Sequence, residues 1–324
     1  MAPTDPMGAA VPLDPVIASV LDMMAANGAP AMSTGTPEQA REGFRQMTVG
    51  LRDPATLAEV ASAEDGTVDG AVGQIRSRTY RPTVSGNCPT LLFIHGGGFV
   101  IGDLDTHDDH ARRLCHDVGA VVVSIDYRLA PEAPFPAGYD DCAAAYRWLV
   151  AHVSELGGDP QRLAVAGDSA GGNLAAAVAI VARDEALPLA AQLLLYPAVD
   201  FAESDAYASR AQNAEGFFLT SDDMRWFGDN YLPDPSAAGD VRASVLRTPS
   251  LEGVAPAIVA TAEYDPLRDE GEAYGKALAD AGVQVVSHRY DGLIHGFFGL
   301  GPISPACAAA VTELCADLKG LLAG

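Results

Sequence analysis

A single serine, Ser169, stands among glycines in the stretch AVAGDSAGGNLAAA at residues 164–177. Glycine destabilises the interior of a helix or a strand, so glycines on both sides of the serine indicate a backbone turn. The stretch matches the pattern G-x-S-x-G, in which a strand turns sharply into a helix and leaves a serine hydroxyl exposed. A nucleophilic serine also needs a base and an acid that orients the base, and both must come from elsewhere in the chain.

The base is sought among the seven histidines, of which His288 and His295 follow the candidate acids. His288 lies inside the apolar stretch VQVVSHRY, which is typical of a hydrogen-bonded histidine within a strand. His295 lies beyond that strand in DGLIHGFFG, where glycines on both sides let its side chain reach over the edge of a sheet. We therefore predict that His295 is the base.

The stretch AIVATAEYDPLRDEG supplies the candidate acids Glu263, Asp265, Asp269 and Glu270. Asp265 ends the predicted strand and precedes Pro266, which stops the strand and can open a helix. Asp269 and Glu270 then fall in the first helical turn, where the helix dipole favours acids. Because catalytic groups gather at the carboxyl ends of parallel strands, we predict Asp265 as the acid. The chain order serine, aspartate, histidine is that of α/β-hydrolases.

A second glycine cluster, FIHGGGFVIG at residues 93–102, follows another predicted strand. Acyl transfer needs hydrogen-bond donors for the oxyanion that develops on the substrate, and glycines expose backbone N–H groups without a side chain in the way. We predict that Gly97, Gly98 and Ala170 donate these N–H groups. His95 and Gly96 are expected to support the loop.

The elements that must position these residues alternate between β-rich and helical stretches from about residue 70 onward. Several strands are continuously apolar, as expected for strands covered by helices on both faces, so the fold class is α/β with a mostly parallel central sheet. Strands are predicted at 70–80, 90–96, 120–128, 162–168, 191–200, 256–265 and 283–292, and helices at 106–118, 138–156, 170–185, 266–282 and 304–322. Two segments break the alternation: residues 1–50 show helical patterns without a strand, and residues 202–246 form a long interruption.

Composition restricts the partners. The formal net charge is −23, and such a surface repels nucleic acids and anionic membranes. The longest apolar run near the serine motif, residues 174–182, is too short to span a bilayer. The five cysteines form no CxxC pattern, and the N-terminus has no positively charged signal region, so we expect a cytoplasmic protein without stable membrane anchoring.

Three other kinds of site are weaker alternatives. The stretch DTHDDHARRLCH contains His107, His110, Cys115 and His116, but a polar helix face explains it better than a metal site, because no HExxH or CxxC accompanies it. A dinucleotide loop would need glycine at position 101, which is isoleucine. A Ser-Lys esterase would need a lysine three residues after a serine, and neither lysine of the chain meets that requirement.

The motifs HGGGF, GDSAGG, DPLRDEG and HGF, in this order, resemble the bacterial hormone-sensitive-lipase family of α/β-hydrolase esterases, GDSAG subgroup. The resemblance covers about residues 70–320. It implies the triad Ser169, Asp265 and His295, with the HGGG stretch as the oxyanion loop. It also implies a catalytic domain of residues 51–201 and 247–324, under a helical cap of residues 1–50 and 202–246. A ligand-binding relative of this fold would lack a triad member, and here all three are present.

The expected activity is a serine carboxylesterase that acts on short- to medium-chain acyl esters without a metal or an organic cofactor. We expect apolar side chains around the serine to bound the acyl pocket: Phe99, Phe217, Phe218, Trp226, Leu267 and Ile294. A homodimer is a further expectation, because an edge strand such as VQVVSHRY could pair across a twofold axis.

Overall fold

The computed structural model describes residues 11–26, 28, 31–202 and 206–323. Its strands form one sheet in the order β1-β2-β4-β3-β5-β6-β7-β8. The pairs β1–β2 and β2–β4 are antiparallel, and all other pairs are parallel, which confirms the predicted mostly parallel sheet. The strands are β1 (Ser62–Gly70), β2 (Gly73–Arg81), β3 (Cys88–Ile94), β4 (Val121–Ile125), β5 (Gly158–Asp168), β6 (Ala191–Leu195), β7 (Ala257–Tyr264) and β8 (Val285–Ile294).

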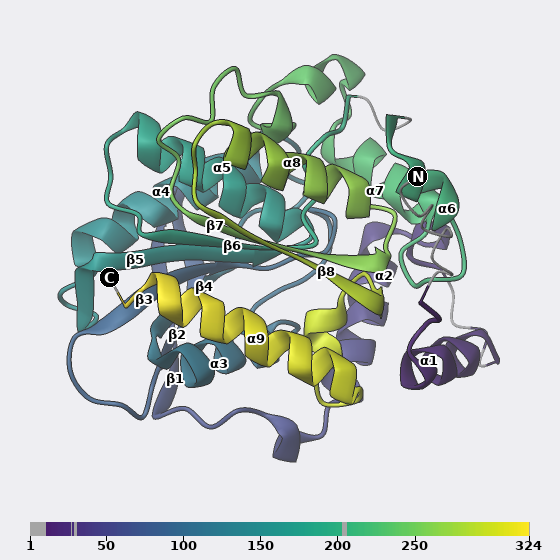
Figure 1. The fold of residues 1–324 in the computed structure, drawn as a ribbon, viewed down its shortest axis with the longest axis horizontal. Helices are drawn as coiled ribbons and strands as arrows, with labels where there is room; N and C mark the ends of the chain where they lie inside the picture. The colour runs from purple at the N-terminus through teal and green to yellow at the C-terminus, as the bar shows by residue number, and fades with distance from the viewer. Residues whose placement is uncertain (1–10, 27, 29–30, 203–205, 324) are drawn as a thin grey trace, which may run out of the picture.

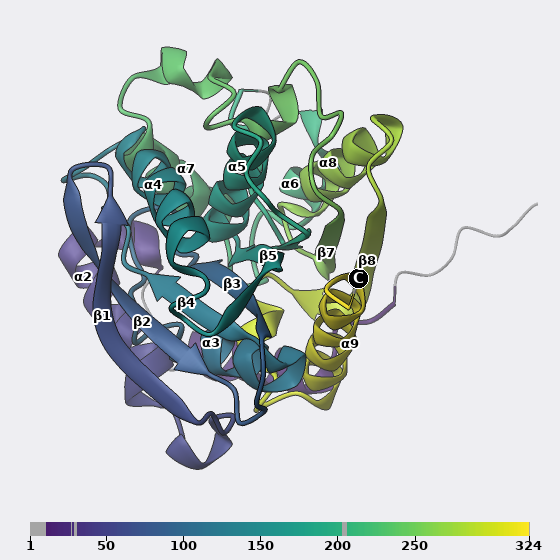
Figure 2. The ribbon, with the colours of Figure 1, turned by 90° about the vertical axis from the view of Figure 1, so that its left-hand side faces the viewer.

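Helices cover both faces of this sheet (Figures 1 and 2). On one face lie α4 (Ala137–His152), α5 (Ala170–Asp184) and α8 (Arg268–Asp280), and on the other lie α3 (Asp108–Leu114) and α9 (Pro305–Leu321). Shorter 3-10 and π turns complete the described chain at Met32–Thr34, Gln46–Gly50, Pro54–Thr56, Cys115–Gly119, Pro235–Gly239, Val245–Arg247 and Phe297–Leu300.

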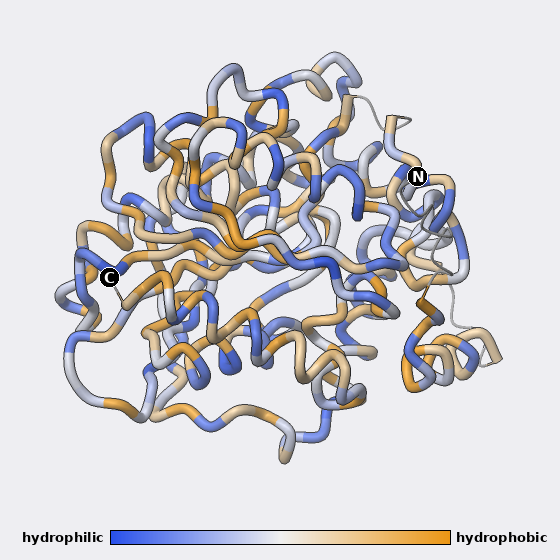
Figure 3. Tube along the Cα trace, in the orientation of Figure 1, coloured by the Kyte–Doolittle hydropathy of each residue, from blue (hydrophilic) through white to orange (hydrophobic). Residues whose placement is uncertain are grey.

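Strand β3 shows why the sheet needs two covering layers. Successive side chains of a strand point to opposite faces, and every residue of β3 except Pro89 is buried. Leu92 and Ile94 pack in the core beneath α4 and α5, whereas Leu91 and Phe93 pack in the core beneath α3 and α9. The apolar character of the central strands is visible along the trace (Figure 3), and it produces the layered α/β fold.

The strand predicted at residues 70–80 is β2, but the sequence analysis missed the strand before it. That strand, β1, forms an antiparallel hairpin with β2, with the turn after Gly70. The sequence of β1, SAEDGTVDG, is polar because β1 is an edge strand in which Val68 alone is buried. An exposed edge strand lacks the apolar residues that reveal the central strands.

The two segments outside the alternating pattern contain helices but no strand where the structure describes them. They contain α1 (Pro15–Ala26) and α2 (Pro37–Arg45), and α6 (Ala208–Gln212) and α7 (Ser221–Tyr231), at the right-hand end of Figure 1. The backbone N–H of Ser33 donates to Asp223 Oδ1 at 2.9 Å, so the two segments contact each other. Residues 1–10, 27, 29–30 and 203–205 of the predicted cap lie outside the described residues.

No helix within the described ranges is long and apolar enough to cross a membrane. The five cysteines are all free and buried.

Candidate active site

The turn from β5 into α5 places Ser169 in a backbone conformation that few residues adopt, with φ 55° and ψ −118°. The neighbouring positions 167 and 171 must be glycine, because the surrounding backbone leaves no room for a side chain. A Cβ on Gly167 would lie 2.2 Å from the backbone oxygen of Gly171, and a Cβ on Gly171 would lie 2.0 Å from that of Ile94. The N–H of Ser169 donates to the backbone oxygen of Leu195 at 2.8 Å, which fixes the strained turn against β6.

The structure brings Ser169, His295 and Asp265 together. His295 Nε2 lies 3.0 Å from Ser169 Oγ, and His295 Nδ1 lies 2.8 Å from Asp265 Oδ2. A carboxylate only accepts, so Nδ1 carries the proton and Nε2 is free to accept the serine proton. Asp265 is fully buried, and its second oxygen accepts from the N–H of Leu267 at 2.8 Å. The aspartate is therefore held at both oxygens, and it orients the imidazole toward the serine.

Hydrogen bonds from α6 and from the residue after it hold the loop that carries Asp265. The side-chain amide of Asn213, directly after α6, donates to the backbone oxygens of Asp265 at 3.0 Å and Glu263 at 3.2 Å. The hydroxyl of Ser209 donates to the backbone oxygen of Pro266 at 2.9 Å. Sequence reasoning missed these contacts, since nothing in the pattern around Asn213 points to a partner some fifty residues away.

Asp269 and Glu270 lie in the first turn of α8, as predicted, but they do more than complement the helix dipole. Asp269 Oδ2 accepts from the N–H of Ser209 at 2.8 Å, and Glu270 pairs with Arg210 of α6. Glu270 Oε1 also accepts from the N–H of Val199 at 2.9 Å. Burial raises the pKa of Glu270 to about 7, although Arg210 acts in the opposite direction. These acids bind α6 to the loop beside Asp265.

The glycine loop after β3 leaves the sheet next to Ser169, because Ile94 of β3 is paired with Gly167 of β5. Gly97 and Gly98 have φ values of 109° and 57°. A Cβ on Gly98 would lie 2.2 Å from the ring of Phe227 in α7. Among the described residues, no hydrogen bond occupies the N–H of Gly97 or Gly98, so both remain available as donors.

The side chains of Asp168 and His95 both support the glycine loop. The N–H of Gly96 donates to Asp168 Oδ1 at 2.9 Å, which ties the loop to the residue before Ser169. Burial opposes ionisation of Asp168, but His107, His110 and the Gly96 N–H together hold the pKa of its carboxyl below the ordinary value. The sequence marked Asp168 only as the acid next to the serine.

His95 also supports the loop, as predicted. Its Nδ1–H donates to the backbone oxygen of Gly96 at 2.8 Å, and its ring stacks on Tyr127 with centroids 4.4 Å apart. The ring is fully buried, and burial together with the neighbouring His107 lowers the pKa of His95 to about 4. His95 is therefore neutral near pH 7.

The predicted pocket aromatics lie in varied surroundings. Phe99 is buried and stacks on Tyr231 of α7 with centroids 3.7 Å apart. The ring of Phe218 packs over Gly296, the neighbour of His295. Trp226 and Phe217 are partly exposed, and their rings contact Phe227 and Tyr264, respectively.

Leu267 and Ile294 are both buried, and each adjoins the triad along the chain. The N–H of Leu267 binds Asp265, and Ile294 directly precedes His295 while it pairs with Tyr264 in the sheet. Ile294 packs in the hydrophobic core beneath α9.

The histidines and the cysteine that the sequence offered as weaker candidates for a base or a metal site do not all come together in one place. His288 Nε2 lies 2.7 Å from Asp317 Oδ2 of α9, as suits a hydrogen-bonded histidine in a strand. Cys115 is buried in the core and His116 is exposed, so neither joins His107 and His110. Those two histidines meet Asp168 instead.

Comparison with known proteins agrees with this geometry. A family profile for the α/β hydrolase fold matches residues 91–299. The carboxylic ester hydrolase LipN of Mycobacterium tuberculosis is 46% identical over 266 residues, which are 80% of this chain and 70% of LipN. The carboxylesterase NlhH of the same species is 40% identical over 326 residues, which are 98% of this chain and 99% of NlhH.

Solved structures give the same result. An ester hydrolase from the metagenome of Lake Arreo matches with a TM-score of 0.91 and 41% identity, over 96% of this chain and 100% of that one. The hyperthermophilic esterase of Pyrobaculum calidifontis matches with a TM-score of 0.90 and 41% identity, over 97% and 100% of the two chains. The chain therefore belongs to the α/β-hydrolase family, and the four relatives named above are ester hydrolases.

Proposed function

We propose that this protein is a serine carboxylesterase in which Ser169 is the nucleophile, His295 the general base and Asp265 the orienting acid. The observation that carries the proposal is the position of His295, with Nε2 3.0 Å from Ser169 Oγ and Nδ1 2.8 Å from Asp265 Oδ2. A ligand-binding role without catalysis would not require this complete set of contacts. The ester hydrolases among its relatives support the same reaction.

The reaction follows from these positions. Ser169 Oγ attacks the ester carbonyl carbon while His295 Nε2 takes the hydroxyl proton. The carbonyl oxygen becomes negative and accepts hydrogen bonds from the N–H groups of Gly97, Gly98 and Ala170. The bond between the carbonyl carbon and the alcohol oxygen then breaks, and His295 gives its proton to the departing alcohol. Water repeats the sequence on the acyl-enzyme, which releases the acid and restores the serine hydroxyl.

Replacing the nucleophile tests the proposal directly. Ser169→Ala should lower kcat on p-nitrophenyl acetate by a factor on the order of 10⁶, as for other serine triads. Ser236→Ala, at an exposed serine, is the matched control and should keep full activity. A serine-directed phosphonate should add one group to Ser169 and none to the Ser169→Ala variant. An alanine variant with more than about a tenth of the wild-type activity would contradict the assignment.

We further propose that residues 1–50 and 202–246 form a cap that limits the length of the acyl chain. Phe227 of α7 packs directly against Gly98, and the contact between Ser33 and Asp223 joins the two segments. Each CH₂ that the pocket buries contributes about 0.8 kcal/mol, so kcat/KM should rise over the first few methylenes and stop once the pocket is full. A series of p-nitrophenyl esters from acetate to palmitate measures this, and a best substrate at palmitate would contradict a closed pocket.

Two properties of the protein in solution complete the proposal. The free, buried cysteines support a location in the cytoplasm, which fractionation of the source cells would test. Strand β8 is the last strand of the described sheet, which supports a homodimer formed by pairing of two β8 strands. Light scattering on the eluted protein measures its mass, and a monomer at all concentrations would exclude the dimer.

A further inference from the structure

Three buried polar side chains converge beneath the oxyanion loop. His107, His110 and Asp168 come from the start of α3 and the end of β5, and each is less than a tenth exposed. One atom from each side chain lies within 4.8 Å of the other two, and His107 Nε2 is 3.5 Å from Asp168 Oδ2. The proposed mechanism uses neither histidine.

Hydrogen bonds determine which nitrogen of His107 faces the cluster. The hydroxyl of Thr106 donates its one proton to the backbone oxygen of Asp103 at 2.9 Å. Thr106 Oγ1 can therefore only accept from His107 Nδ1, which lies 2.9 Å away. Nδ1 carries the proton, and in the neutral ring the lone pair is on Nε2, the atom that faces Asp168.

His110 is oriented in the same way. Its Nδ1 lies 2.9 Å from Asp109 Oδ1, and because a carboxylate accepts, Nδ1 is the donor. The nitrogen left for the cluster is again Nε2. With both rings neutral, two imidazole lone pairs face a carboxylate oxygen and the three acceptors cannot satisfy one another, whereas a protonated ring would donate to Asp168.

A cation is needed to hold these acceptors together. Around them, Asp168 and Asp109 carry two negative charges, and Arg52, 3.7 Å from Asp109, supplies one positive charge. With both imidazoles neutral the cluster has an excess of negative charge, which either a proton or a metal ion could balance. Histidines that ligate metals almost always donate the other ring N–H to a carboxylate or a similar acceptor, as both do here.

We propose that His107 Nε2, His110 Nε2 and Asp168 Oδ2 bind a divalent transition-metal ion of the Zn²⁺ type. Two imidazoles and one carboxylate are a donor set that suits zinc and its neighbours in the first transition row. Zinc ligands at about 2.0–2.1 Å in a tetrahedron are about 3.4 Å apart, so binding would draw the side chains inward by up to roughly 1 Å. The sequence disfavours a metal site because no HExxH or CxxC accompanies the histidines, and it does not reveal Asp168, which lies far from them along the chain.

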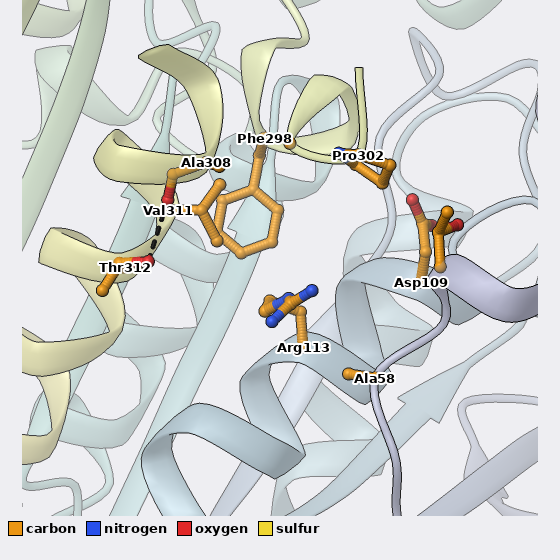
Figure 4. A pocket seen from close by; sticks show the side chains of 10 residues that line it. Ala58, Asp109, Arg113, Phe298, Pro302, Ala308, Val311 and Thr312 are labelled. Atoms are coloured by element: carbon orange, nitrogen blue, oxygen red, sulfur yellow. Dashed lines mark hydrogen bonds between the residues drawn. The ribbon is translucent and has the colours of Figure 1, made fainter. Parts of the chain in front are cut away.

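A cavity with a volume of about 110 Å³ lies near this cluster, between α9, α3 and the segment before β1 (Figure 4). Asp109, Arg113 and Phe298 are among its walls, whereas the three cluster residues are not. The ring of Phe298 is 5.1 Å from that of His110, and the carboxylate of Asp109 binds His110.

The ion would act on stability and positioning. Asp168 directly precedes Ser169, and its other oxygen accepts from the N–H of Gly96 in the oxyanion loop. A metal ion on Asp168 Oδ2 would thus connect the serine turn, the oxyanion loop and α3 through one atom. It would take no part in the ester chemistry.

Titration of protein freed of metal by a chelator tests the site. Zn²⁺ should bind with one equivalent in calorimetry, and Co²⁺ in its place should give the visible absorption of a four- or five-coordinate site. At a free Zn²⁺ concentration of about 100 Kd, Tm should rise by roughly 5 °C. His110→Gln should weaken binding at least tenfold, whereas His116→Gln, an exposed histidine in the turn after α3, should leave the affinity unchanged.

Circular dichroism of the metal-free variants shows whether each one folds. If His110→Gln does not fold, Asp109→Asn is the second variant, and loss of this orienting carboxylate should weaken binding by about tenfold. Absence of stoichiometric binding to the wild-type protein would overturn the proposal, and a proton would then be the cation of the cluster. Binding of equal strength in wild type and His110→Gln would overturn it as well. The site is independent of the esterase assignment, so neither result depends on the other.

Discussion

The side-chain amide of Asn213 lies 3.0 Å from the backbone oxygen of Asp265, so the segment inserted after β6 holds the loop that carries the acid of the triad. Asn213→Ala removes this contact and the one to Glu263. The loop can then shift, and we expect kcat to fall about tenfold, equivalent to about 1.4 kcal/mol, with little change in KM.

Asn230→Ala is the matched control for this experiment. Asn230 lies in α7 of the same segment and also donates to a backbone oxygen, but that oxygen belongs to Trp226 of its own helix, at 2.8 Å, and not to the Asp265 loop. Steady-state kinetics of the two variants should therefore differ. Equal losses of kcat would show that Asn213 only stabilises the segment.

Asp265 determines which nitrogen of His295 carries the proton. In Asp265→Asn an amide stands where the carboxylate accepts from Nδ1, so the imidazole is no longer held in the tautomer that accepts from Ser169. We expect kcat to fall by about 10⁴ with the fold intact. Asp317→Asn changes a similar carboxylate–histidine pair, Asp317 with His288, away from the triad and should leave kcat unchanged. Activity of Asp265→Asn within about a hundredfold of wild type would contradict the role.

Gly98 is required for both its backbone conformation and its lack of a side chain. In Gly98→Ala the methyl group would overlap the ring of Phe227, and φ of 57° would strain the alanine. The displaced N–H can no longer meet the oxyanion, so kcat should fall by about 10²–10³. Gly282→Ala, with φ of 83° but open space around it, controls for backbone strain alone and should retain its activity. A fully active Gly98→Ala enzyme would remove Gly98 from the oxyanion hole.

Buried, neutral His95 should make the fold sensitive to acid. Its pKa is about 4 in the folded protein and about 6.5 in the unfolded chain, so between these values the unfolded chain binds more protons. The contribution of neutral His95 to the free energy of unfolding is present above about pH 6.5 and is lost progressively toward pH 4. The total loss is roughly 3 kcal/mol, with about 2 kcal/mol lost by pH 5.

Urea unfolding at pH 7 and pH 5 measures this loss. The wild-type protein should lose about 2 kcal/mol more than His95→Asn over that interval, because asparagine does not titrate. His116→Asn, at an exposed histidine, should behave like wild type. A loss in His95→Asn as large as that in wild type would assign the acid sensitivity to other groups.

Each residue of the proposed triad is marked locally in the sequence, and the structure brings the three together. Ser169 has glycines that no other residue can replace, Asp265 ends an apolar strand before a proline, and His295 follows the last strand. Contacts that exist only in three dimensions leave no such mark. Asn213 looks like any polar residue of a long insertion, and Asp168 meets His107 only because β3 and β5 are neighbours in the sheet.

The strands of the sheet also differ in how clearly the sequence marks them. Central strands such as β3 are recognisable because both of their faces are buried. The edge strand β1 is not, because its polar residues face solvent and resemble those of a loop. The helices predicted at 170–185 and 304–322 match α5 and α9 to within one residue at each end.

The attachment of α6 to the Asp265 loop limits how enzymes of this design can be diversified. Exchange of residues 202–246 with the matching segment of a relative looks like a simple route to new substrate preferences. That exchange would also replace Ser209, Arg210 and Asn213, which hold the loop of the catalytic acid. A chimaera that joins the foreign segment after Asn213 would keep those three residues and alter only the part that contains α7. Natural variation in acyl preference should be concentrated in the same stretch, while residues 209–213 change slowly.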